Sequence, residues 1–268
     1  MENIERVEEP ISNFDEVITR LVSDHVKYHT IHFFKKTKVD TFVPVCTRVL
    51  VHLYGVFCVF TTGHVREFID DFNYLYFQCD PNKYITCEET SRDSDDKVKT
   101  NPDIVYLKLA HDVVEQLLAF GQQFLPLDKI LLYHTGYQTN QYAILGYPPE
   151  LEEQVEENIL PNGFLFSCAM ADVQPYDPFI YKKDTHYILP YSNPINISGG
   201  TSAKRQVYDL RCSGLWYISV TEQKDKCEYD YYFIGITKEY YQHKRSQHIV
   251  ANKIQSLIAQ LQEDLSYE

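Results

Sequence analysis

The sequence has little of what marks several large classes of protein. It contains one tryptophan and two methionines among 268 residues, and its apolar runs are short. The longest run, residues 45–60, is interrupted by Arg48 and His52 and is shorter than the 18 or so residues that cross a bilayer. We therefore predict that this run forms a buried helix or a pair of strands, and we expect no membrane partner.

Positive charge is also scarce. The chain has 25 Lys and Arg residues against 38 Asp and Glu residues, which gives a formal net charge of −13 at pH 7. Proteins that bind nucleic acid normally carry a basic patch. The few close basic residues are Lys35, Lys36 and Lys38, then Lys182 and Lys183, Lys204 and Arg205, and Lys244 and Arg245. We expect no specific nucleic-acid partner.

Cysteine motifs are missing although the chain has seven cysteines. There is no Cys-x-x-Cys pair and no Cys/His group with the spacing of zinc ligands, so we expect no metal and no cofactor. The acidic first ten residues lack the apolar segment of a secretory signal, which favours synthesis in a reducing compartment. The polar surroundings and the odd total still indicate thiols that can oxidise. The candidate cross-linking residues are Cys79, Cys87, Cys212 and Cys227.

Catalytic motifs are equally scarce. The chain has no Gly-x-Ser-x-Gly and no His-Glu-x-x-His, and the glycine-rich loop at 198–205 lacks the glycine that precedes the lysine of a P-loop. A cysteine nucleophile can be assembled from Cys58 with His64, or from Cys168 with His186. Apolar surroundings disfavour the thiolate of Cys58, so neither pair is favoured. We expect no enzyme activity and no catalytic or cofactor-binding residues.

Periodicity predicts an α+β fold in which helices predominate. A helical N-terminal half and a C-terminal helix flank a tyrosine-rich β region. The predicted helices cover residues 12–28, 65–76, 101–124, 148–160 and 246–265. The predicted strands cover residues 129–133, 142–147, 164–170, 179–181, 186–191, 206–210, 215–220 and 229–237. The charged segment 88–100 suggests a boundary between subdomains 1–100 and 101–268, which can also form one continuous domain.

Tyrosine is what the chain has in abundance. There are 22, and fifteen of them lie between Tyr133 and Tyr241. A tyrosine gives a large rigid contact surface with one hydrogen-bonding tip, so tyrosines are enriched at protein interfaces. The densest groups supply the candidate interface residues Tyr229, Tyr231, Tyr232, Tyr240 and Tyr241.

Many tyrosines, an acidic balance, no signal segment and several cysteines outside known motifs together resemble the matrix proteins of viral occlusion bodies. These are the polyhedrins, and the size is similar to the nudivirus type. The resemblance implies a structural protein of an insect virus that self-assembles into a crystal lattice around virions. It also implies disulfides, terminal helices packed on neighbouring copies, and a location in the nucleus of the infected cell and then in released occlusion bodies.

Two alternatives remain open at this point. One is an α+β hydrolase with a site near His134, His186 and Lys204, which are polar residues of the predicted β region. The other is a module that binds a partner protein through its tyrosine-rich sheet. A single deep pocket with converging polar groups would favour the hydrolase, and one large exposed patch would favour the module.

Overall fold

The computed structural model describes two large β-sheets, one two-stranded sheet and three α-helices. The described residues are 7–9, 14–37, 41–63, 75–80, 83–86, 103–134, 141–147, 153–155, 158–160, 164–169, 184–190, 194–195, 210, 212–223, 226–243 and 246–267. None of the described helices is long and apolar enough to cross a membrane.

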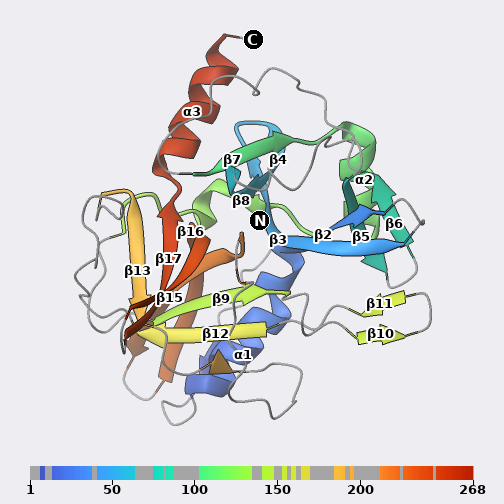
Figure 1. Ribbon diagram of the computed structural model, residues 1–268. Helices are drawn as coiled ribbons and strands as arrows, with labels where there is room; N and C mark the ends of the chain where they lie inside the picture. The colour runs from blue at the N-terminus through green and yellow to red at the C-terminus, as the bar shows by residue number, and fades with distance from the viewer. Residues whose placement is uncertain are drawn as a thin grey trace.

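The first half of the chain builds a seven-stranded sheet in the order β6-β5-β2-β3-β4-β7, with β8 parallel to β3 (Figure 1). Its strands are β2 (Thr30–Lys36), β3 (Phe42–Leu53), β4 (Val56–Thr61), β5 (Leu75–Asp80), β6 (Lys83–Thr86), β7 (Val105–Lys108) and β8 (Leu125–Pro126). Tyr54 and Gly55 join β3 to β4 with φ angles of 52° and 82°. Positive φ at both positions is typical of the two-residue turn whose twist matches the strands.

The second half builds an eight-stranded antiparallel sheet in the order β13-β17-β16-β15-β9-β12-β14, with β1 paired to β16. Its strands are β1 (Val7–Glu9), β9 (Gln141–Gly146), β12 (Phe164–Ala169), β13 (His186–Pro190), β14 (Pro194–Ile195), β15 (Gly214–Gln223), β16 (Lys226–His243) and β17 (Ser246–Lys253). The first part of β16 pairs with β15 and its last part with β17, and register shifts at Leu215/Trp216 and Thr237/Glu239 accompany this change of partner. Such irregularities let a strand bend.

The remaining elements lie around and between the sheets. They are the helices α1 (Phe14–Asp24), α2 (His111–Ala119) and α3 (Gln255–Ser266), the 3-10 turns η1 (Val26–His29) and η5 (Leu127–Lys129), and the hairpin β10 (Glu153–Val155) and β11 (Asn158–Leu160). In Figure 1, α3 projects at one end, whereas α1 lies near the opposite end, beside β9 and β12.

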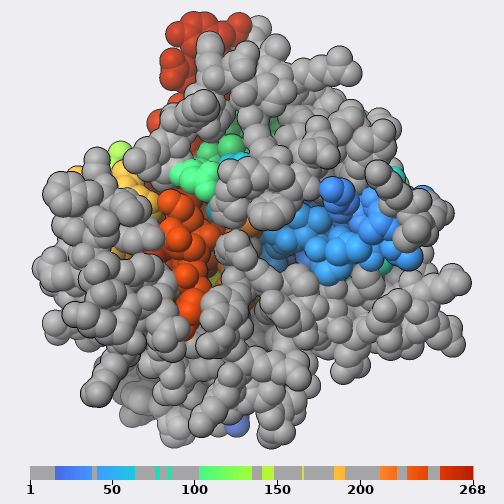
Figure 2. Space-filling model, viewed as in Figure 1, coloured from blue at the N-terminus to red at the C-terminus, as the bar shows by residue number. Residues whose placement is uncertain are grey.

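Three clusters of buried apolar side chains make up the core. One belongs to the N-terminal sheet and contains Phe33, Leu50 and Leu107. Another belongs to the C-terminal sheet and includes Ile144 and Ile234. The third draws residues from both sheets and from α1 and α3, so it packs the two halves together. The face seen in Figure 2 agrees, because blue surface from the β2 region and orange surface from the C-terminal sheet lie near each other.

The predicted α+β, helix-predominant fold is wrong, because the described chain is mainly β. The predicted helix 101–124 is instead β7 followed by the nine-residue α2. The acidic segment 148–160 contains the hairpin of β10 and β11, and residues 246–253 form β17 before α3 begins. In each case pairing with a neighbouring strand overrides a local helical pattern.

Other predictions were right. The helix expected at 12–28 is present as α1 and η1, and the apolar run 45–60 is the strand pair β3 and β4. The apolar stripe of α3 is also as predicted. Residues 65–74 of the predicted helix 65–76 lie outside the described residues, as do the strands 179–181 and 206–209, whereas residues 75 and 76 begin the strand β5 instead of ending a helix. The boundary at residue 100 stays a prediction.

The expectation that a terminal helix packs on another copy is wrong. The apolar stripe of α1, with Ile18 and Val22, and that of α3, with Leu257 and Leu261, are buried in the shared core of their own chain. Burying both stripes internally leaves neither helix an apolar face to exchange with a neighbour.

Candidate functional site

The end of β4 brings the N-terminal sheet against the turn that precedes β15. β4 ends at Thr61, and the next residue, Thr62, is fully buried. The Thr62 hydroxyl lies 2.8 Å from the sulfur of Cys212, within hydrogen-bond distance. Cys212 is 1% exposed and packs in the core cluster of the N-terminal sheet, although it lies far along the sequence. This contact places the Cys212 thiol at the junction of the two sheets.

Asp103 lies against the other side of the same segment. A Cβ atom added to Gly63 would come within 2.5 Å of Asp103 Oδ1, so only a glycine allows the backbone this close to the carboxylate. The backbone oxygen of Asp103 accepts a 3.0 Å hydrogen bond from the buried amide of Asn252 in β17. Asp103 also precedes β7, which pairs with β4. Both sheets therefore contribute to holding Asp103.

The turn before β15 holds Cys212 in an uncommon backbone conformation. Its φ is 67°, in the left-handed region that residues with a Cβ rarely adopt. The Cys212 N–H donates to Thr237 O at 2.8 Å, and the Ser213 N–H donates to Leu210 O at 3.2 Å. Conformations of this kind cost about 1–3 kcal/mol and are concentrated at functional sites. The strain makes Cys212 a candidate functional residue.

Ser213 is the neighbouring nucleophilic side chain, but it faces a different element. A Cβ atom added to Gly146 of β9 would collide with Ser213 Oγ, so the hydroxyl lies against β9. Ser213 is fully buried, and its Oγ has no hydrogen-bond partner. Of the two adjacent residues, Cys212 is therefore the one whose side chain reaches Thr62.

A second thiol lies beside Cys212. Cys46 of β3 is buried in the same core cluster as Cys212, and the two thiols interact. Burial and this neighbour raise the pKa of Cys46 well above the ordinary thiol value, while the charge of Arg48 acts in the opposite direction. Cys46 is therefore a neutral thiol at pH 7.

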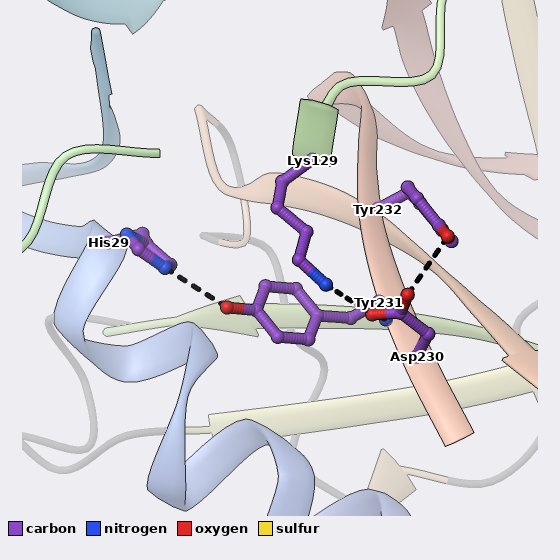
Figure 3. Close-up of polar contacts among 5 residues, drawn as sticks. All are labelled: His29, Lys129, Asp230, Tyr231 and Tyr232. Carbon is purple, nitrogen blue, oxygen red and sulfur yellow. Dashed lines mark hydrogen bonds and ion pairs between the residues drawn. The ribbon is translucent and has the colours of Figure 1, made fainter. Parts of the chain in front are cut away.

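A separate polar cluster ties β16 to the N-terminal part of the chain (Figure 3). Lys129, at the end of η5, is buried and forms an ion pair with Asp230. Its ammonium also lies 4.7 Å from the centre of the Tyr231 ring, and Tyr232 donates a 2.9 Å hydrogen bond to Asp230. Tyr231 Oη lies 3.2 Å from His29 Nε2. Its charges are paired internally, so this cluster is better suited to joining the two halves than to chemistry.

The predicted interface tyrosines all lie on β16. Tyr229 is buried in the shared core, and Tyr231 and Tyr232 are part-buried in the Lys129 cluster. Tyr240 packs partly against the core of the C-terminal sheet, and the side chain of Tyr241 is outside the described residues. Contact of these residues with other copies remains a prediction.

The predicted cross-linking cysteines have different surroundings. Cys212 is buried and is not in a disulfide. The backbones of Cys79 and Cys227 lie in β5 and β16, but their side chains are outside the described residues, as is all of Cys87. Of the four candidates, Cys212 is therefore the one whose side-chain surroundings the structure describes. The cross-links of the other three remain predictions.

The alternative hydrolase site near His134, His186 and Lys204 stays a prediction. His134 Nε2 lies 2.6 Å from Tyr142 Oη, and burial lowers the pKa of His134 to about 4. His186 Nδ1 lies 2.8 Å from Thr185 Oγ1. The two imidazoles therefore have separate partners, and Lys204 lies outside the described residues.

The structure also bears on the thiol pairs considered from the sequence and on metal binding. Burial raises the pKa of Cys58 to about 12, which makes it a poor nucleophile. The side chain of Cys168 and all of His64 lie outside the described residues. In the part of the chain that the structure describes, no three or more His, Cys, Asp or Glu residues group as metal ligands.

The sequence analysis weighed His64 with Cys58 and did not consider Asp103 or Cys212 beside it. A signal was present. His64 directly follows the Thr61–Gly63 segment at the end of an apolar strand, Asp103 stands two residues before another, and Cys212 stands two before a third. Polar residues at the ends of core strands are where a sheet-based protein carries its chemistry.

No protein-family model and no curated protein matches the sequence. Among solved structures, the chain is similar to the thermostable serine protease AL20 from an extremophilic microorganism, with a TM-score of 0.47 and 15% identity over 87% of this chain and 94% of that one. It is also similar to the scabies mite inactivated protease paralogue S-I1, with a TM-score of 0.47 and 11% identity over 91% and 97% of the two chains. Similarity at this level assigns no activity.

The resemblance to occlusion-body matrix proteins is wrong. The nudivirus type was favoured by an expected helix-rich chain, whereas the observed architecture is built on β-sheets. The predicted function of an occlusion-body matrix protein is therefore also wrong. The predicted partners and location are tested by none of these observations.

Proposed function

We propose that the chain is a thiol hydrolase in which Cys212 is the nucleophile, His64 the general base and Asp103 the residue that orients the base. The observation that supports it is that two adjacent residues contact the two groups: the Thr62 hydroxyl lies 2.8 Å from the Cys212 sulfur, and the backbone of Gly63 lies close to the Asp103 carboxylate. His64 is the next residue in the sequence. A nucleophile, an imidazole and a carboxylate are the three groups that recur in acyl-transfer sites on unrelated folds.

The chemistry follows from these groups. The neutral imidazole of His64 takes the thiol proton, and the Cys212 thiolate attacks the carbonyl carbon of an amide or ester. The imidazolium then protonates the leaving group, and water hydrolyses the resulting thioester with His64 again acting as base. Asp103 stabilises the imidazolium and holds its orientation. The substrate class is therefore an acyl compound, and peptides and simple esters are the first to test.

The experiment compares four variants of the full chain in hydrolysis of an acyl ester and of a pool of fluorogenic peptides. We expect Cys212→Ala and His64→Ala to reduce kcat/KM to background. Asp103→Asn should lower kcat by about 10²- to 10⁴-fold. Ser213→Ala is the matched control, because Ser213 is adjacent and equally buried but faces β9, and it should keep nearly full activity.

Two results would refute the assignment. If Cys212→Ala keeps the hydrolysis of the unmodified chain, another residue is the nucleophile. If Ser213→Ala rather than Cys212→Ala abolishes it, the nucleophile is the serine. Mass spectrometry of the acylated protein, quenched in acid, locates the acyl group independently of the rate measurements.

A specific observation favours a second candidate function, that of a binding protein without catalysis. The N–H of Cys212 donates to Thr237 O, and the N–H of Ser213 lies 2.9 Å from Thr237 Oγ1. Amides used in this way do not serve as donors to a developing oxyanion. Absence of hydrolysis and of acylation in the folded chain, with every substrate tested, would support this function and exclude the hydrolase.

A further inference from the structure

Cys46 and Cys212 bring two thiols together from opposite halves of the chain. Cys46 lies within β3 of the N-terminal sheet, and Cys212 lies in the turn before β15 of the C-terminal sheet. Both are buried in one core cluster, neither is in a disulfide, and their thiols interact. Cys58, on the neighbouring strand β4, is a third buried free thiol. The contact therefore singles out one pair of thiols.

Arg48 gives this pair an unusual electrostatic environment. It lies two residues after Cys46, so both side chains point to the same face of β3. Arg48 is 0% exposed, and its guanidinium carbon lies 4.3 Å from the centre of the Phe33 ring. Among the residues that the structure describes, none of its three nitrogens has a hydrogen-bond partner. A buried charge without an anion is strongly unfavourable.

A thiolate at Cys46 would supply the missing anion. The Arg48 charge lowers the pKa of Cys46, against the larger opposite effect of burial. The guanidinium therefore favours the anionic form of Cys46 at the moment when a proton leaves the pair. A thiolate is the form of cysteine that attacks an oxidised sulfur.

We propose that Cys46 and Cys212 are a redox pair that oxidation joins by a reversible disulfide, with Arg48 as the cation that accompanies the Cys46 thiolate. The site is a modification site, and the oxidant is a small peroxide, because both sulfurs are buried. The consequence for activity rests on the proposed function: a disulfide at Cys212 removes the nucleophile and switches the hydrolase off.

The reaction balances in two steps. The Cys212 thiolate attacks one oxygen of hydrogen peroxide, the O–O bond breaks, and a sulfenic acid and water form once the released hydroxide takes a proton. The Cys46 thiolate then attacks the sulfenic sulfur, the S–O bond breaks, and a second water leaves. In total, two thiols lose two electrons and two protons, and one peroxide is reduced to two waters.

The test treats the folded full chain with hydrogen peroxide, alkylates the remaining thiols and examines a non-reduced digest by mass spectrometry. We expect a peptide pair that joins Cys46 to Cys212, which dithiothreitol separates. Cys46→Ala should abolish it and leave Cys212 to oxidise further. Cys58→Ala is the matched control, because it removes a buried thiol of the same sheet, and the linked pair should still form.

Arg48→Met tests the role of the guanidinium. Linkage should slow by about tenfold or more, which corresponds to a loss of about one pKa unit of thiolate stabilisation. Arg48→Lys keeps the charge and should link faster than Arg48→Met. Equal rates for all three proteins would remove Arg48 from the proposal.

The outcomes separate the redox pair from the hydrolase. Absence of the linked peptide, whether both thiols stay reduced or Cys212 alone is oxidised, would overturn the redox pair. A linked peptide in a chain that shows no hydrolysis when reduced leaves the redox pair standing and refutes the hydrolase. Full hydrolysis by completely linked protein refutes Cys212 as the nucleophile without affecting the redox pair.

Discussion

Two buried histidines make the stability of the chain sensitive to acid. His29 and His32 are each 4% exposed. Burial lowers the pKa of His29 to about 4 and that of His32 to about 3. The backbone oxygen of Gln123 accepts a 3.0 Å hydrogen bond from His29 Nδ1, which leaves Nε2 to accept from the Tyr231 hydroxyl. Both imidazoles are thus neutral at pH 7, and the surroundings of His29 suit its neutral form.

The size of the effect follows from linkage. In the unfolded chain both histidines have a pKa near 6.5, so below that pH the unfolded state binds protons that the folded state does not. Their stabilisation is complete above pH 6.5 and is lost as the pH falls towards the folded values. Each group contributes about 1.4 kcal/mol per pH unit, so the pair removes about 4 kcal/mol between pH 6.5 and 5. That is a large part of the free energy of unfolding of a typical protein, which is about 5–15 kcal/mol.

The assay is urea unfolding from pH 7.5 to 5, followed by the fluorescence of Trp216. This is the only tryptophan in the chain, and it is fully buried, so unfolding exposes it. His32→Phe keeps a ring to stack on Tyr147, which lies 5.7 Å away, and should lose about half of the pH dependence. His111→Asn is the control, because its side chain is 86% exposed, and it should behave as the unmodified chain does.

Either of two results would refute this reasoning. One is an unfolding free energy that stays constant from pH 7.5 to 5. The other is a His32→Phe variant that keeps the full pH dependence although it is folded at pH 7.5. Loss of the pH dependence in His111→Asn alone would place the titrating group on the surface instead.

Three further changes test the packing by urea unfolding. Asp230→Ala leaves the Lys129 ammonium buried without its carboxylate and should lower the unfolding free energy by about 3–5 kcal/mol, most of which Lys129→Met in the same chain should restore. Gly63→Ala adds a methyl group 2.5 Å from Asp103 Oδ1 and should cost about 1–3 kcal/mol, and less in an Asp103→Ala background. Arg48→Met removes a buried guanidinium without a hydrogen-bond partner and should raise the unfolding free energy by about 1–4 kcal/mol, so a lower midpoint would contradict the burial argument.

Local pattern was a sufficient guide where an element is long or strongly apolar. The run 45–60 predicted a strand pair as one of two possibilities, and the stripes of α1 and α3 were read correctly. The helix predicted at 101–124 from the local pattern was wrong because the segment carries good helix-start signals and its strand is only four residues long. Pairing of β7 with β4 decides the structure there, and that contact is not visible in the local sequence.

The candidate site also depends on contacts that the local sequence does not show. His64, Asp103 and Cys212 are distant in sequence, and their spacing matches no short motif. What relates Asp103 to Cys212 is the packing of two sheets, seen in the contacts of Thr62 with Cys212 and of Gly63 with Asp103. Non-local contacts of this kind cannot be derived from one sequence, whereas the position of polar residues beside apolar strands can.

The surroundings of the tyrosines explain why the amino-acid composition led to the wrong prediction of a self-assembling protein. A tyrosine is favoured at an interface because it combines apolar area with a hydroxyl that needs a partner, and both properties suit a core that contains other polar groups. Tyr142 is fully buried with its hydroxyl 2.6 Å from His134, and Tyr187 is 4% exposed with its hydroxyl 3.4 Å from the backbone oxygen of His134. Tyr231 reaches His29 in the same way. In this chain, tyrosines and histidines satisfy one another's buried polar groups within one molecule, so a high tyrosine content is compatible with a core that is closed within one molecule.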